Sequence, residues 1–348
     1  MDNFISKKQS TILKGIAIVF MVIHHFFTYP EWYKNIADFG MYENVFSFLC
    51  EPFRLCVPIF AILTGYAYSG KRDLSLKKSM KKIISFLISY WIIYLLLVFV
   101  ATVICKTPID WFYLSTGLLG VTKRYAIFCW YVYFFVSVMI SLPLLRKIWK
   151  KGIVWCFLTL ILCRIGVGMM LNVHIAHEIW IVIYDYFYYL SAVTIGFMIG
   201  EWNIFSKISK IGVFSGNSLL SKVLLVIIGV GSFLAPAVIG IEIKRINVTA
   251  IYAAVLIYCI VAIQSKEERM GIFEFFGKHA TNIWFLHCIF FADGTERIFK
   301  RILYWPHYPV LIFVWGMTLC VLLSYCVIWI NQGIKKYKTG GIINDKNK

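Results

Sequence analysis

Ionisable side chains lie inside long apolar stretches of this chain, where a charge is costly and therefore marks a candidate functional residue. Within 11–29, Lys14 and His25 are eleven positions apart. In an α-helix this spacing is three turns plus about 20°, so the two residues share one face and lie about 16 Å apart along the axis. An imidazole can take or give a proton near neutral pH. A lysine can meet an anion, although Lys14 could equally snorkel to lipid phosphates.

A second group of such residues begins the next apolar stretch. Glu51 and Arg54 are three positions apart, the spacing at which opposite charges pair on one helix face. Pro58 has no backbone N–H and clashes with the carbonyl four residues earlier, which belongs to Arg54. We therefore expect a bend here with Arg54 lining a cavity. A purely structural kink is the alternative.

Three further ionisable residues lie inside later apolar stretches. His287 falls near the middle of 281–297, and Asp185 stands in a run of tyrosines between Tyr184 and Tyr186. Arg164 lies within 152–171. We expect Arg164 and Asp185 to pair with each other or with the backbone rather than to take part in chemistry.

The composition indicates that lipid is the solvent for most of the chain. Of its 348 residues, 60% are hydrophobic and 15% are charged, whereas soluble domains have roughly 45–50% apolar and about 25% charged residues. Backbone groups in lipid must be satisfied within the protein, so the spanning segments should be helices. The predicted fold class is all-α, a polytopic integral membrane protein. We expect a single membrane-embedded domain over 1–348 with a short basic tail at 332–348.

A transmembrane helix needs about 20 apolar residues, and ten stretches approach that length: 11–29, 46–69, 83–105, 129–145, 152–171, 179–200, 223–240, 248–264, 281–297 and 309–331. The stretches 129–145 and 281–297 are short or polar and could tilt or break. An even number of spans places both termini on one side. Lys and Arg outnumber Asp and Glu by 35 to 17, and they gather in the loops on that side. The positive-inside rule therefore makes both termini cytoplasmic. Gly196 and Gly200 permit close helix contact.

The charged residues of the first two apolar stretches, together with two motifs later in the chain, resemble the acyltransferase-3 family. Its members are integral membrane acyltransferases, which modify cell-surface glycans and lipids. Lys14 and His25 match the family pattern of a basic residue, ten residues and a His. The family pattern of the second helix is matched at five positions: Arg54, Pro58, Phe60, Thr64 and Gly65. This chain departs from the pattern in two ways, because Thr64 replaces the usual Ser and the usual pair of aromatic residues does not coincide neatly. Trp130-Tyr131 resembles the aromatic pair of the fourth helix, and Phe285-Leu286-His287 resembles the late-helix His.

The resemblance implies an O-acyltransferase. It would move an acyl group, most commonly acetyl, from a cytoplasmic acyl-CoA-type donor such as acetyl-CoA to a hydroxyl of a cell-surface polysaccharide or related glycan. His25 would act as general base or carry the acyl group transiently. Arg54 would stabilise the oxyanion or hold donor phosphates. Glu51 would orient His25, Lys14 would meet the anionic donor, and His287 would be a second base.

The expected location is the plasma membrane of a bacterial cell. The expected partners are the acyl donor, a glycan or lipid-linked glycan acceptor and membrane lipids, without nucleic acid. No metal is expected, because His24 and His25 are adjacent and face different ways. Two other functions stay open. A carrier or flippase for lipid-linked glycans would not need His25 as a base. A structural partner of a glycan-assembly complex should tolerate replacement of Lys14, His25 and Arg54 together.

Overall fold

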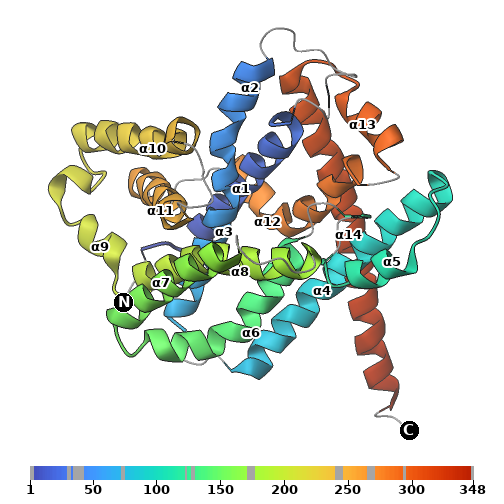
Figure 1. Ribbon diagram of the computed structural model, residues 1–348, viewed down its shortest axis with the longest axis horizontal. Helices are drawn as coiled ribbons and strands as arrows, with labels where there is room; N and C mark the ends of the chain where they lie inside the picture. Colours follow the sequence, from blue (N-terminus) through green and yellow to red (C-terminus); the bar gives the residue numbers. More distant parts are fainter. Residues whose placement is uncertain are drawn as a thin grey trace. The chain divides into compact units, whose positions relative to one another are not determined.

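The computed structural model describes residues 4–29, 33, 43–71, 75–121, 124–126, 130–170, 177–239, 246–264, 271–292 and 295–345. Within these ranges every regular element is a helix (Figure 1). The predicted all-α fold class is therefore confirmed. Which side of the membrane holds the termini stays a prediction.

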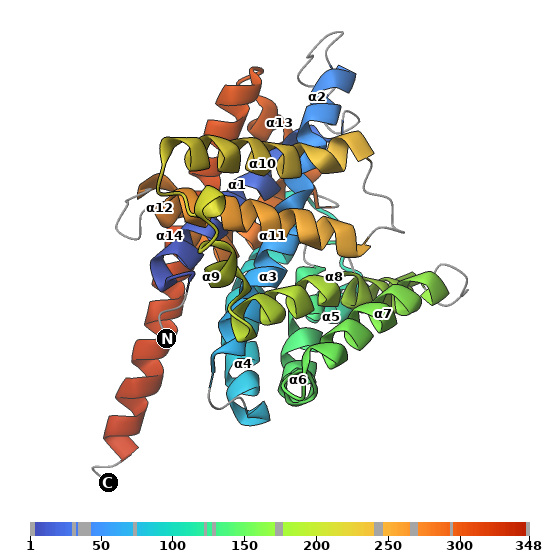
Figure 2. The ribbon, with the colours of Figure 1, turned by 90° about the vertical axis from the view of Figure 1, so that its left-hand side faces the viewer.

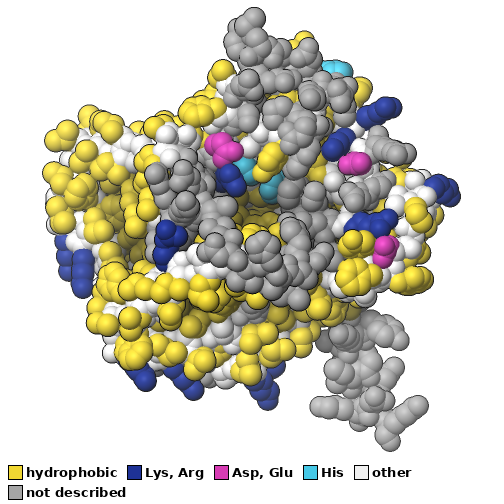
Figure 3. Space-filling view, in the orientation of Figure 1, with side chains coloured by type: hydrophobic (Ala, Val, Ile, Leu, Met, Phe, Trp, Pro, Cys, Tyr) yellow, Lys and Arg dark blue, Asp and Glu magenta, His cyan; other side chains and the backbone are white. Residues whose placement is uncertain are grey.

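Eight helices of the described residues are long and apolar enough to cross a bilayer. They are α1 (Lys7–Phe27), the run Phe48–Ser69 with η3 (Glu51–Leu55) and α3 (Cys56–Ser69), α4 (Leu76–Phe99) with its π-helical end η4 (Val100–Ile104), α6 (Tyr131–Trp149), α7 (Ile153–Met170), α8 (His177–Glu201), α10 (Leu219–Ile239) and α14 (Pro309–Asp345). α11 (Ile246–Ile263) contains a shorter apolar helix, Val248–Ile263. The outward faces of α7 and α10 are covered by hydrophobic side chains, as expected of surfaces that meet lipid (Figure 3).

The remaining elements are short or more polar: α2 (Glu43–Cys50), α5 (Trp111–Gly117), α9 (Ile204–Ile208), η5 (Gly212–Phe214), α12 (Gly271–Leu286), η7 (His287–Phe290) and α13 (Glu296–Tyr304). The predicted span 281–297 is not one helix. α12 begins ten residues earlier, with Glu274 and Lys278 paired at 2.9 Å, and it ends at Leu286. The predicted tail 332–348 continues as helix through Asp345.

The chain forms two compact units. The first comprises Met1–Trp32, Phe39–Lys81 and Tyr133–Ala280, and the second comprises Tyr33–Asp38, Lys82–Val132 and Thr281–Lys348. The single-domain organisation stays a prediction.

In the first unit, α3 and α8 approach each other closely through glycines (Figures 1 and 2). A Cβ at Gly65 would overlap the backbone of Val193, and one at Gly196 would overlap the backbone of Ile62. One at Gly200 would overlap the side chain of Ser69. Small residues of this kind let helix backbones come close in membrane proteins. The Gly196-x3-Gly200 spacing therefore serves a contact within the chain.

α1 crosses α12 in the same way. A Cβ at Gly15 would overlap the carbonyl of Phe273, and one at Gly277 would overlap the carbonyl of Thr11. Ser6 and Gln9 form a capping box that satisfies the first backbone N–H groups of α1. The start of α1, which carries Lys14, is therefore held by backbone contact.

The second unit is built around α4, whose side chains bind the end of α5. Tyr90 donates to the carbonyl of Gly117 at 2.5 Å, and the Trp91 indole donates to the carbonyl of Leu118 at 2.8 Å. These bonds satisfy carbonyls that a helix end leaves without intrahelical partners. Asp110 caps the other end of α5. A hydrogen bond of 3.0 Å from Asn282 to Ser324 joins α12 to α14.

The α3–α8 contact gives a first prediction. Gly196→Leu should lower the unfolding midpoint, because overpacking a close helix contact costs about 1–3 kcal/mol. The measurement is thermal unfolding of the detergent-solubilised protein, followed by tryptophan fluorescence. The control is Gly231→Leu in α10, where a Cβ would meet no atom within 4 Å. Equal midpoints for the two variants would contradict the role given to this contact.

Candidate active site

Arg54 is presented by a break between two helical segments. η3 is a 3-10 turn with Pro52 near its start, and α3 begins immediately after it at Cys56. Pro58 thus lies in the first turn of α3, and the predicted bend takes the form of a change of helix type. The carbonyl of Arg54, which Pro58 cannot bond, accepts the Cys56 thiol at 3.7 Å.

The predicted pairing of Arg54 with Glu51 is confirmed. Arg54 Nη1 donates to Glu51 Oε2 at 3.2 Å, and the side chains are 45% and 32% exposed. An ion pair this exposed contributes little to stability, about 0–1 kcal/mol. It orients the guanidinium and leaves part of it accessible to a ligand. The partner that the structure shows for Glu51 is Arg54. The role of Glu51 in orienting His25 stays a prediction.

Arg54 lines a polar cavity of about 250 Å³ inside the first unit. The other lining residues come from three helices: Pro58 of α3, Tyr184, Asp185, Tyr188 and Tyr189 of α8, and Thr249 of α11. The prediction that Arg54 lines a cavity is therefore confirmed.

The polar groups of this cavity are held by hydrogen bonds from neighbouring helices. Tyr133 of α6 donates its hydroxyl proton to Asp185 Oδ2, and Tyr188 shares a hydrogen bond with Thr249. Arg54 is held by its ion pair with Glu51. Arg164, which we expected to pair with Asp185 or with the backbone, lies at an exposed position on α7. A hydrogen bond from Tyr133 helps to position Asp185.

His24 and His25 lie at the end of α1, and the structure gives them different environments. His24 is 5% exposed. Its Nδ1 lies 2.9 Å from Thr28 Oγ1, and its ring also hydrogen-bonds to the backbone of Cys50. His24 therefore ties α1 to the segment that carries Arg54. His25 is half-buried, with Nδ1 3.1 Å from Met21 Sδ and its ring centroid 5.3 Å from that of His24.

A cluster of phenylalanines packs the end of α1 against η3. Phe20 meets Phe53 edge-on at 5.1 Å between ring centroids, and both rings contact Phe233 of α10, at 5.2 and 5.1 Å. Aromatic pairs in such geometry add about 0.5–1.5 kcal/mol each beyond the area they bury. This cluster fixes the His-bearing end of α1 beside the Arg54 segment.

Lys14 is exposed and lies on the same continuous helix as His25. The helix rise keeps the two residues about 16 Å apart along the axis. The structure therefore does not bring them together. A role for Lys14 would have to act on a distant part of a long ligand.

His287 belongs to the second unit. It is fully buried at the start of η7, directly after α12. Trp284, three residues earlier, packs on Tyr131 at 4.7 Å and on Trp130 at 6.4 Å between ring centroids. The two later motifs of the resemblance are therefore neighbours in space.

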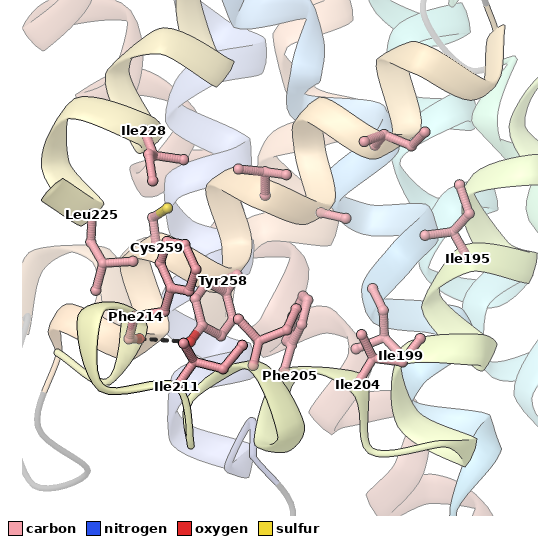
Figure 4. A pocket seen from close by; sticks show the side chains of 14 residues that line it. Ile195, Ile199, Ile204, Phe205, Ile211, Phe214, Leu225, Ile228, Tyr258 and Cys259 are labelled. Atoms are coloured by element: carbon pink, nitrogen blue, oxygen red, sulfur yellow. Dashed lines mark hydrogen bonds between the residues drawn. The ribbon is translucent and has the colours of Figure 1, made fainter. Parts of the chain in front are cut away.

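A second cavity of about 500 Å³ lies in the first unit between α8, α9, η5, α10 and α11 (Figure 4). The described residues that line it include no Lys, Arg, His, Asp or Glu. Its Tyr258 hydroxyl donates to the carbonyl of Phe214 at 2.7 Å, and Phe4 stacks on the Tyr258 ring at 5.6 Å. This lining suits hydrocarbon. The polar cavity at Arg54 is the better candidate for group transfer.

Comparison with protein families matches the chain, over residues 8–329, to the model described as "Acyltransferase domain". The chain belongs to the acyltransferase-3 family. The matched region covers nearly all of both units and all of the candidate residues. Among the described residues it also covers the eight helices able to span a membrane, apart from Lys7 of α1 and the end of α14. The protein is thus a multi-pass membrane acyltransferase. Comparisons with curated proteins and with solved structures gave no match.

Sequence reasoning missed part of the polar cavity at Arg54. The tyrosine run around Asp185 was visible, but neither Tyr133 nor Thr249 was singled out for the site. Thr249 lies in Asn247-Val248-Thr249, which has the form of a glycosylation sequon. Its buried side chain instead lines the cavity from the first turn of α11. No local signal in the sequence identifies it.

Replacement of Arg54 gives a second prediction. Arg54→Ala should lower acyl transfer by about 10²–10³-fold, the usual effect of removing one oxyanion donor. Arg54→Lys should fall between this variant and the original chain, because lysine keeps the charge without the planar fork. The unfolding midpoint should barely change. Transfer is measured in isolated membranes at matched protein levels, and full activity in Arg54→Ala would contradict the assignment.

Proposed function

We propose that this acyltransferase moves an acetyl group from cytoplasmic acetyl-CoA to a hydroxyl of a cell-surface polysaccharide, and that it works in the plasma membrane of a bacterium. The observation that carries the proposal is the family match over 8–329. The polar cavity at Arg54, with His25 on the helix packed beside it, supports the choice of site. Donor and acceptor follow from the resemblance of the motifs.

The chemistry assigns one task to each group. The acceptor oxygen attacks the thioester carbonyl, a C–O bond forms, the C–S bond breaks, and the thiol of the donor leaves. His25 takes the hydroxyl proton as general base. In the alternative path its ring nitrogen attacks first and the acyl-imidazole then passes the group to the hydroxyl. Arg54 stabilises the negative charge that develops on the carbonyl oxygen.

Lys14 and His25 would contact different parts of the donor along α1. The thioester would react beside His25 and Arg54. The anionic part of the donor would be held near Lys14, about 16 Å away along the helix. A compact charge on a flexible stem is adequate for that contact. His287 stays a second candidate base, carried by the other unit.

His25 provides the test of this proposal. Mass spectrometry of surface polysaccharide compares cells with the chain, without it, and with His25→Asn. The control is His307→Asn, which changes an exposed His at φ 62° to a residue that tolerates this conformation. We expect the surface polysaccharide to carry the added mass of an acetyl group in cells with the original chain or with His307→Asn. Cells without the chain, or with His25→Asn, should lack this added mass. The membrane level of each variant is measured alongside.

Two outcomes would contradict the proposal in different ways. An acetyl increment that persists in His25→Asn would remove His25 from the mechanism. If the protein is a carrier instead, no cell should show the acetyl mass on its polysaccharide. Glycan export should then fall in cells without the chain and return to normal in cells with His25→Asn.

A further inference from the structure

We propose that the cavity at Arg54 binds one uncharged sugar ring of the acceptor, and that Asp185 and Thr249 are the residues that hold its hydroxyls. This inference rests on the proposed function and names the substrate class of the same site. It gives a binding role to residues for which the family motifs quoted above supply none.

The chemistry of the lining fits a polyol. Asp185 offers carboxylate oxygens that accept hydrogen bonds, Thr249 and Tyr188 offer hydroxyls that donate and accept, and Arg54 offers donors only. A sugar hydroxyl both donates and accepts, so it can use each of these groups. Small-molecule sites generally place a few convergent polar groups of this kind among apolar walls.

The positive and negative charges on the residues that line the cavity are equal in number. One Arg and one Asp line the cavity. The Arg is also paired with Glu51 at its exposed edge, and the Asp accepts a hydrogen bond from Tyr133. A site for a phosphate or a carboxylate should instead present an excess of positive charge. The lining therefore favours an uncharged ligand.

The size and the walls limit the ligand to one ring. Drug-sized ligand sites usually occupy about 300–1,000 Å³, and this cavity has about 250 Å³. Tyr184, Tyr188 and Tyr189 supply aromatic walls, and aromatic side chains combine an apolar body with a polar tip. The Tyr184 ring is itself stacked between Trp180 and Tyr188, at 4.8 and 5.7 Å. These walls are rigid, so a chain of sugars would have to extend out past the exposed Arg54.

Binding can be tested without catalysis. The unfolding midpoint of the full chain in detergent is titrated with methyl α-glucopyranoside, methyl β-galactopyranoside and methyl N-acetyl-β-glucosaminide. Glucuronate serves as the charged comparison. We expect a saturable rise with at least one methyl glycoside and a smaller response to glucuronate. A chain that responds to no methyl glycoside, or that prefers glucuronate, would overturn the inference.

Variants locate the binding site. Asp185→Asn keeps an oxygen to accept from Tyr133, and Thr249→Val keeps the shape of the side chain. Each should weaken glycoside binding at least tenfold. Tyr186→Phe is the matched control on the same helix, because its hydroxyl lies 2.9 Å from Ser141 Oγ and does not line the cavity. Unchanged binding in both test variants would place the sugar elsewhere and overturn the inference.

A kinetic measurement separates this inference from the proposed function. With acetyl-CoA as donor and the bound glycoside as acceptor, Asp185→Asn should raise the KM for glycoside at least tenfold. The Tyr186→Phe control should keep the KM of the original chain. If the chain binds glycoside but consumes no acetyl-CoA, the proposed function is contradicted and the inference of a sugar-binding cavity stands. Transfer with an unchanged KM in Asp185→Asn would keep the function and reject the site.

Discussion

The close approach of α3 and α8 is the constraint on which the rest of the candidate site depends. Gly65 lets α3 reach the backbone of Val193, while Gly196 and Gly200 let α8 reach Ile62 and Ser69. Lipid provides no hydrophobic drive between helices, so close packing of this kind has to supply the association. It sets the start of α3, and Arg54 of η3 just before it, against the half of α8 that carries Asp185 and the tyrosines.

Polar groups between packed helices cost free energy to bury unless they have hydrogen-bond partners. The protein meets this demand with neighbours from other helices: Glu51 binds Arg54, Tyr133 binds Asp185, and Thr249 binds Tyr188. The same partners hold the groups in fixed directions, which a transfer reaction requires. The buried His24 and the phenylalanine cluster then bring His25 to the same part of the first unit. The same contacts therefore position the candidate site.

Much of this arrangement was predictable from the sequence, and the limits have physical causes. Hydropathy located most of the spans, because a helix in lipid must be long and apolar. The Glu51–Arg54 pair and the cavity at Arg54 followed from local spacing and from Pro58. The helix end at Leu286 was harder to place, since the polar start of α12 hides a helix that begins at Gly271. Tyr133 and Thr249 reach the site through tertiary packing, which local sequence does not encode. Arg164 was expected to pair with Asp185 or with the backbone; it lies at an exposed position on α7, and Asp185 accepts a hydrogen bond from Tyr133.

The most direct test of the central claim is an experimental structure of the full chain in lipid with a thioether analogue of acetyl-CoA. We expect the acyl end to lie beside Arg54 within reach of His25, and the anionic end to extend toward Lys14. An acyl end found in the apolar cavity near Tyr258, or at His287 without contact to Arg54, would contradict it.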